Sequence, residues 1–210
     1  MGQGRRMTAY VIGVTGQLGS GKSTVAMLLR EFGATAIDAD DVTRDVMQPG
    51  QPAFSAIHAQ FGRDILAEDG TIDRAKLGQK VFGDPQALRR LEQIVWPHVI
   101  ARVLDVRAGM FDDSVLAVEA IKLLEAPLRR VCDEIWVTVA PRETLVSRVT
   151  GRGMAAAEAR MRLGTQMSEA EYRRFATTVI DNTGDEKQLR RQVEEAWRRS
   201  QDRVKRRVTG

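Results

Sequence analysis

A glycine-rich string between two apolar segments carries the clearest chemical signal in this sequence. Residues 16–23 read Gly-Gln-Leu-Gly-Ser-Gly-Lys-Ser, the spacing of loops that cradle nucleotide phosphates. Glycines let main-chain N–H groups turn inward, and a helix that starts where the loop ends adds its positive end. A glycine-rich turn arising by chance is the alternative. The residues expected to bind the nucleotide are Gly19, Ser20, Gly21, Lys22, Ser23 and Thr24.

Two side chains of this loop have separate expected roles. The Lys22 ammonium is expected to reach the β and γ phosphates, which makes it a catalytic candidate. The Ser23 hydroxyl is the expected protein ligand of Mg²⁺, with Thr24 assisting from the next position. A phosphate loop alone does not separate kinases from GTPases, ATPases or motor domains. The absence of an Asn-Lys-x-Asp string and the short chain favour a small-molecule kinase.

Carboxylates follow the second apolar segment, residues 34–37. Ligands of open parallel sheets gather at the carboxyl ends of the strands, so Asp38 and Asp40 are expected to face the same crevice as the loop. One of them would take or orient the proton of an attacking hydroxyl. We prefer Asp40, because alternation along an extended segment turns both side chains the same way and sets Asp40 deeper. The alternative is that Asp40 or Asp41 caps the next helix.

Arginines cluster in a helical segment after the fourth predicted strand. Phosphoryl transfer spreads negative charge over oxygens, and a cationic flap would stabilise that charge and exclude water. The alternative is an exposed helix with long basic side chains. The four residues are Arg148, Arg152, Arg160 and Arg162.

The elements that must position these residues alternate in type along the chain. Short apolar runs separated by amphipathic segments predict an α/β fold with a five-stranded parallel sheet covered on both sides. Residues 41–109 contain only helical patterns, which predicts a helical insertion. The predicted strands are residues 10–14, 34–37, 115–118, 134–139 and 177–180, and the predicted insertion helices are 53–61, 73–82 and 85–107.

Composition limits the remaining possibilities. A chain of 210 residues with 43% hydrophobic and 29% charged residues fits one compact domain with a modest appendage. There is no apolar run of eighteen residues and no apolar core in the polar start, Met1 to Thr8, so we expect a cytoplasmic protein without a membrane partner. Cys132 is the single cysteine, which excludes an internal disulfide.

The excess of positive charge lies at the end of the chain. The net charge is +4, and from Lys187 onward nine Lys or Arg residues stand against three acidic ones. Such a run is typical of a solvated helix face, and nucleic-acid binding is the alternative. An amphipathic helix serves a dimer contact and a core equally well, so a monomer or a weak homo-oligomer is expected.

Four strings together make the chain resemble the dephospho-CoA kinase family of P-loop kinases, over residues 10 to about 196. The resemblance implies a three-layer P-loop nucleotide kinase fold with a helical acceptor-binding insertion and a small lid. It also implies ATP-dependent phosphorylation of the ribose 3′-hydroxyl of dephospho-CoA to give coenzyme A and ADP. The strings are Ile12-Gly13-Val14-Thr15-Gly16 with Gly19-Ser20-Gly21-Lys22-Ser23-Thr24; Ile37-Asp38-Ala39-Asp40; Asp69-Gly70-Thr71-Ile72-Asp73-Arg74 with Lys76-Leu77-Gly78 and Val81-Phe82; and Val179-Ile180-Asp181-Asn182-Thr183-Gly184.

Carried onto this chain, the resemblance implies roles for individual residues. ATP lies on the segment Gly19 to Thr24 with Mg²⁺, Asp40 is the base or hydroxyl-orienting carboxylate, Arg148 is the lid arginine, and Asn182 approaches the adenine. The implied core is about residues 8–48 and 110–200, within one domain of residues 8–200. The insertion is about 49–109, the lid about 148–168, and a basic tail covers 201–210.

The chain departs from the family pattern at two places near the expected acceptor pocket. Trp96 stands where the family usually has a histidine, and the segment Leu116 to Glu125 lacks the family's proline and contains an inserted Lys122. These changes allow a shifted acceptor preference. Another nucleoside or nucleotide kinase remains the alternative function, followed by a nucleotide-gated protein that binds nucleic acid through its basic end.

Overall fold

The computed structural model describes residues 8–209 and divides the chain into two compact units. One unit runs to Ile37 and resumes at Arg107, and the other is Asp38–Val106. The polar start considered above falls almost entirely in residues 1–7, which with residue 210 lie outside the described part. None of the helices described has both the length and the apolar character needed to cross a lipid bilayer.

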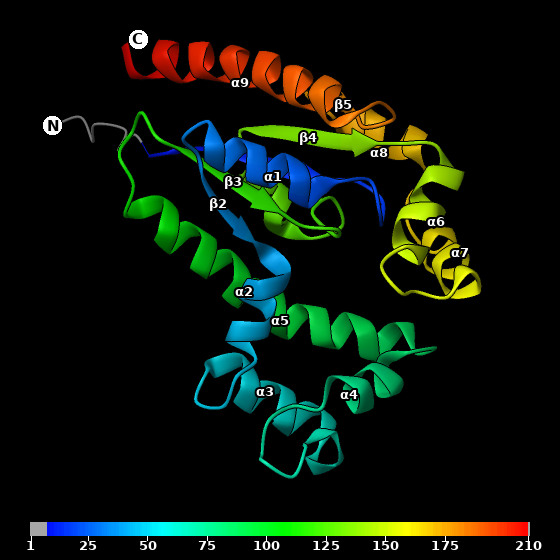
Figure 1. Cartoon of the computed structure of the whole chain (residues 1–210). Coiled ribbons are helices and arrows are strands. Elements are labelled where there is room, and N and C mark those ends of the chain that lie inside the picture. Colours follow the sequence, from blue (N-terminus) through cyan, green and yellow to red (C-terminus); the bar gives the residue numbers. More distant parts are fainter. Residues whose placement is uncertain (1–7, 210) are drawn as a thin grey trace, which may run out of the picture. The chain divides into compact units, whose positions relative to one another are not determined.

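The first unit is built on a five-stranded sheet with the order β2-β3-β1-β4-β5 (Figure 1). Strand β1 is parallel to β3 on one side and to β4 on the other, and β4 is parallel to β5. The predicted α/β fold with a parallel sheet is confirmed. The strands are β1 (Tyr10–Thr15), β2 (Thr35–Asp38), β3 (Val115–Glu119), β4 (Glu134–Val139) and β5 (Thr178–Asp181).

Helices α1 (Lys22–Glu31) and α9 (Glu186–Thr209) share one hydrophobic core with the sheet (Figure 1). Apolar residues recur on each helix at the three- and four-residue spacing that forms a single stripe. The buried members of this core from the two helices are Val25, Leu28, Leu29, Leu189, Val193, Ala196 and Val204. They pack against strand residues that include Ile12, Val14 and Trp136, and this packing fixes α1 behind the phosphate loop.

Another part of the chain approaches β1 at Gly13. A Cβ atom placed there would lie 2.8 Å from both Cys132 Sγ and Leu123 Cδ1, so the tight fit requires glycine. Nearby, the buried Tyr172 of α8 (Glu169–Phe175) donates its hydroxyl hydrogen bond to the carbonyl of Ile121 over 3.4 Å. The segment after β3, including the short helix η2 (Pro127–Val131), is thereby held to the core.

Two further helices of this unit form a smaller core of their own. Helix α6 (Arg142–Thr150) contributes Leu145, Val146 and Val149, and α7 (Ala156–Gly164) contributes Ala159 and Leu163. Leu18, from the phosphate loop, packs against this core with its side chain partly buried.

The second unit is helical, as the lack of a strand pattern predicted. Its N-caps follow local chemistry, since the Asp73 carboxylate accepts the N–H groups of Ala75 and Lys76 at the start of α4. Helix α5 continues through Pro97, in agreement with the single helix predicted for residues 85–107. The elements are α2 (Ala39–Val46), α3 (Pro52–Phe61), the short helix η1 (Arg63–Ile65), α4 (Arg74–Val81) and α5 (Pro85–Ala108), whose last turn reaches the first unit.

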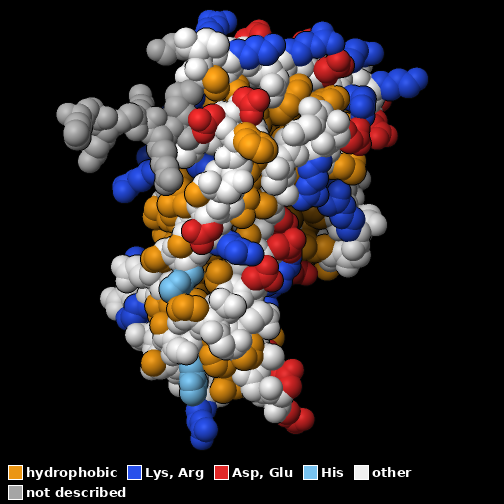
Figure 2. Space-filling model, turned by 90° about the vertical axis from the view of Figure 1, so that its left-hand side faces the viewer, with side chains coloured by type: hydrophobic (Ala, Val, Ile, Leu, Met, Phe, Trp, Pro, Cys, Tyr) orange, Lys and Arg blue, Asp and Glu red, His pale blue; other side chains and the backbone are white. Residues whose placement is uncertain are grey.

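The end of the chain differs from the expected tail. Helix α9 runs on to Thr209, with Val204 only 2% exposed in the core. Arg203 pairs with the buried Glu134 over 2.8 Å, and Arg207 pairs with Asp133 over 3.0 Å. Lys and Arg side chains gather along the top of Figure 2, where α9 lies. Part of this basic run therefore anchors the helix, because burial and ion pairing extend past residue 200.

Candidate nucleotide site

The loop between β1 and α1 has the backbone that its glycines predicted. Gly16, Gly19 and Gly21 have φ values of 145°, 79° and 100°, in the region that favours glycine. A Cβ atom on any of the three would come closer than 3.0 Å to a neighbour: the Thr138 carbonyl at Gly16, the Leu145 carbonyl at Gly19, and Asn182 Nδ2 at Gly21. Both conformation and space therefore require glycine here.

Polar side chains from the ends of β4 and β5 hold this loop. The hydroxyls of Ser20 and Thr138 lie 2.6 Å apart, and Thr138 Oγ1 also donates to the carbonyl of Thr15 over 3.2 Å. Asn182, just after β5, donates from Nδ2 to the carbonyl of Ser20 over 2.8 Å. All these groups are buried, so the loop keeps its shape without a ligand.

The start of α1 offers positive charge to an anion. Its N-cap is Gly21, which has no side chain to accept the first N–H groups of the helix, and these groups attract negative charge. Lys22 is 6% exposed, and its Nζ donates to the carbonyl of Gln17 over 3.2 Å across the loop. The ammonium is thus placed at the loop, as the sequence predicted, although its contact with phosphate stays a prediction.

Ser23 lies next to a carboxylate from β3. Its Oγ donates to Glu119 Oε1 over 2.7 Å, and the Ser23 side chain is exposed. A hydroxyl and a carboxylate are the hard oxygen donors that Mg²⁺ prefers. Within residues 8–209 no group of three or more His, Cys, Asp or Glu side chains is arranged to hold a metal. A magnesium ion here would take its other ligands from phosphates and water.

A pocket of about 200 Å³ opens beside the loop. The Arg148 guanidinium donates from Nη2 to the carbonyl of Asn182 over 2.8 Å. Its Nη1 is buried without a hydrogen-bond partner among the described residues. The pocket is lined by Gly19, Gly21, Thr24, Arg148, Arg152, Asn182, Gly184, Glu186 and Leu189.

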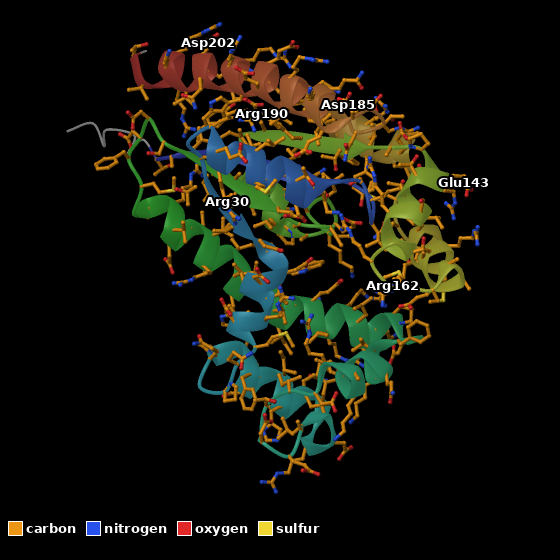
Figure 3. All side chains as sticks on the ribbon, viewed as in Figure 1. Arg30, Glu143, Arg162, Asp185, Arg190 and Asp202 are labelled. Carbon is orange, nitrogen blue, oxygen red and sulfur yellow. The ribbon has the colours of Figure 1, made fainter. Side chains whose placement is uncertain are left out.

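The four arginines of the predicted flap divide into two pairs. Arg148 and Arg152 line the pocket, whereas Arg160 and Arg162 are exposed on α7 and are not among its lining residues. Arg162, labelled in Figure 3, pairs with Glu158 one turn earlier over 2.7 Å. The alternative of an exposed basic helix therefore describes Arg160 and Arg162.

The argument from alternation for Asp40 is wrong. Helix α2 begins at Ala39, so Asp40 lies in its first turn and not on an extended segment. Asp38 caps this helix, since its Oδ1 accepts the N–H of Asp40 over 2.7 Å. Capping therefore explains Asp38, and neither Asp40 nor Asp41 is the cap. Asp40 is exposed and belongs to the second unit, while the loop belongs to the first. Its catalytic role stays a prediction.

Two loop-holding residues were missed from the sequence. Thr138 is a polar residue near the carboxyl end of a buried strand, and that position is a signal that could have identified it. Gln166 accepts the N–H of Leu18 at its Oε1 over 2.9 Å, and no local pattern marks it. Gln166 lies 148 positions after Leu18 in the sequence, so only the fold reveals the contact.

Known proteins resemble this chain over most of its length. A family model described as dephospho-CoA kinase matches residues 10–188. The dephospho-CoA kinase of Geobacter metallireducens is 45% identical over 192 residues, covering 90% of this chain and 95% of the relative. That of Thermobifida fusca is 40% identical over 194 residues, covering 92% and 97%.

Solved structures show the same fold. A Thermus thermophilus protein aligns with a TM-score of 0.79 at 30% identity, covering 91% of this chain and 97% of its own. A shikimate kinase from Acinetobacter baumannii, at 16% identity and a TM-score of 0.52 over 91% and 92% of the two chains, shares only the fold. With the family model and the close relatives spanning nearly the whole chain, the protein belongs to the dephospho-CoA kinase family.

Proposed function

We propose that the protein transfers the γ-phosphoryl group of ATP to the ribose 3′-hydroxyl of dephospho-CoA, giving coenzyme A and ADP. The observation that carries this proposal is the glycine loop, whose shape is held by Ser20, Thr138 and Asn182, in a chain of this family. A small-molecule kinase needs such a preformed anion site because catalysis rests on positioning and charge stabilisation.

The loop would bind the triphosphate through its own donors. The first N–H groups of α1 and the Lys22 ammonium would contact the β and γ phosphates, and they need no rearrangement because the loop is already ordered. Arg148, which lines the pocket beside the loop, would add a further cationic side chain. The pocket that Arg148 lines is also lined by Asn182, which favours a contact with the nucleoside part of ATP.

Ser23 and Glu119 fit the requirement for Mg²⁺. When bound, the ion would neutralise charge on the phosphate oxygens. Ser23 would supply a direct oxygen ligand, and Glu119, which already accepts the Ser23 hydroxyl, would orient it. The acceptor would be bound by the helical segment of about residues 50–105, with Asp40 orienting or deprotonating its hydroxyl. A cytoplasmic location also stays a prediction.

An assay of ADP release tests the proposal. Dephospho-CoA is expected to be the preferred acceptor over AMP and adenosine, with ³¹P NMR placing the new phosphate on the 3′ position. D40N should lower kcat by about a hundredfold or more while the ATP dissociation constant changes less than threefold, since a group acting in the transition state affects rate more than binding. K22A should lower kcat and also weaken ATP binding.

Asp41 provides the matched control. It neighbours Asp40 on α2, and its exposed carboxylate pairs with Arg44, so D41N should leave kcat within threefold of the wild type. Equal activity with AMP would reject the proposed acceptor. A D40N protein that loses ATP binding instead of turnover would reassign Asp40 to the nucleotide site.

A further inference from the structure

The tip of the phosphate loop is tied to the segment that follows α7. The main-chain N–H of Leu18 donates to Gln166 Oε1 over 2.9 Å. Next to it, Gln17 Nε2 donates to the carbonyl of Met167 over 3.0 Å. Both donors lie on the loop and both acceptors on residues 166–167. Two hydrogen bonds between adjacent residue pairs fix the orientation of the loop tip relative to residues 166–167, whereas one bond alone would allow rotation.

Apolar packing reinforces this connection. The side chain of Leu18 packs against the small core formed by α6 and α7, where Leu145 and Leu163 are each 1% exposed. The loop tip is therefore held to one neighbouring region by its side chain as well as its main chain.

Helix α7 joins this contact to the pocket. Arg152, which lines the pocket, lies in the turn before α7, and Gln166 lies just after its end. Nine helical residues span about 13 Å at the usual rise per residue. Opposite ends of one short rigid element thus lie at the pocket and at the loop tip.

We infer that Gln166 is a positioning residue for ATP binding. By accepting the N–H of Leu18, it sets the orientation of the peptide groups at the loop tip, and the following N–H groups of Gly19 and Ser20 depend on that orientation. Without this acceptor a part-buried main-chain donor would lack its protein partner. The inference rests on the proposed binding of ATP at the loop, and it does not depend on the acceptor.

Two substitutions at Gln166 separate hydrogen bonding from size. Q166L keeps the approximate volume and removes the acceptor, while Q166E keeps acceptor oxygens at the same reach. Gln201 on α9 supplies the control, Q201L, which makes the same chemical change at a half-buried position. All variants are made in the full chain.

Three measurements test the role. ATP binding is followed by calorimetry without acceptor, exchange of the Leu18 amide by NMR, and kcat with KM for ATP in the steady state. Q166L should weaken ATP binding about tenfold, the equivalent of about 1.4 kcal/mol or one hydrogen bond, and speed Leu18 exchange by a similar factor. KM should rise more than kcat falls. Q166E should keep Leu18 exchange within threefold of the wild type, whatever its added charge does to ATP binding, and Q201L should stay within threefold in every measurement.

The inference is overturned if Q166L binds ATP and protects Leu18 like the wild type, or if the Leu18 amide of Q166E exchanges as fast as that of Q166L. Should Q166L fail to fold by circular dichroism, Q166A decides the question by ATP binding and Leu18 exchange, because it removes the same acceptor without adding a branched apolar side chain. The variants could show the expected pattern of ATP binding while the wild-type protein is inactive with dephospho-CoA. That result would support this inference and refute the proposed acceptor.

Discussion

Replacing Gly21 by alanine tests whether the loop is held in the way the structure indicates. The substitution forces a non-glycine residue to a φ of 100° and places its Cβ against Asn182 Nδ2. The left-handed conformation costs an L-residue about 1–2 kcal/mol. Moving Asn182 away breaks its 2.8 Å hydrogen bond to the Ser20 carbonyl, which costs about 1 kcal/mol more.

The expected total is therefore about 2–3 kcal/mol, or a factor of about 30 to 150 in an equilibrium constant. If the loop keeps its shape, the cost appears in the free energy of unfolding. If the loop relaxes, it appears as weaker ATP binding. Urea unfolding measures the change in the free energy of unfolding, and calorimetry measures the change in the free energy of ATP binding. The sum of the two changes is compared with the expected total.

Gly33 supplies the control for backbone strain. Its φ is 106°, and nothing lies within 4 Å of an added Cβ, so G33A should cost only the conformational part. A second comparison uses N182A. That change should cost about 1 kcal/mol alone and almost nothing more when added to G21A, because the same hydrogen bond is already lost.

Two results would refute this reasoning. The first is an equal cost for G21A and G33A, which would mean that the contact with Asn182 carries no energy. Alternatively, the costs of G21A and N182A could add fully, which would mean that the two residues are not coupled.

Two other predictions concern opposite ends of the sheet. Burial of Glu134 favours a raised pKa, but hydrogen bonds from Trp136, Arg203 and Tyr10 outweigh it and hold the pKa below its usual range. The stability that ionised Glu134 contributes to the fold is complete above the unfolded-state pKa of about 4.3. It is lost as pH falls through the lower folded-state pKa. E134Q should therefore lower the free energy of unfolding at neutral pH by about 2 kcal/mol and make it depend less steeply on pH below about pH 4.3. Urea titrations across pH measure both effects, and an unchanged slope of the free energy against pH would contradict this prediction. S23A should raise the Mg²⁺ concentration for half-maximal activity about tenfold while S23T stays near the wild type, and equal Mg²⁺ requirements would remove Ser23 from the metal site.

Local patterns in the sequence predicted much of the fold. The α/β alternation, the five strands and the helices of residues 53–61, 73–82 and 85–107 agree with the structure within one or two residues. Each depends on neighbouring side chains, whose spacing decides whether one helix face or one strand can be buried. The phosphate loop was recognisable for the same reason, since its φ values require glycine at fixed positions within eight residues.

Local sequence patterns could not predict the contacts between segments that are distant in the chain. The extended reading of Asp38 and Asp40 failed for a local reason instead, because Asp38 caps a helix that starts one residue later. The expected tail failed because Val204 and Arg203 find burial and a partner on strands far away in sequence.

The sequence by itself therefore determined the chemistry of the loop, the kind of most elements and the family. Only the tertiary structure decided which side chains hold the loop. Thr138, Gln166 and Asn182 are each separated from it by more than a hundred residues, and strand order and helix packing bring them there. Periodicity reports what one segment can bury, whereas these hydrogen bonds depend on which segments become neighbours.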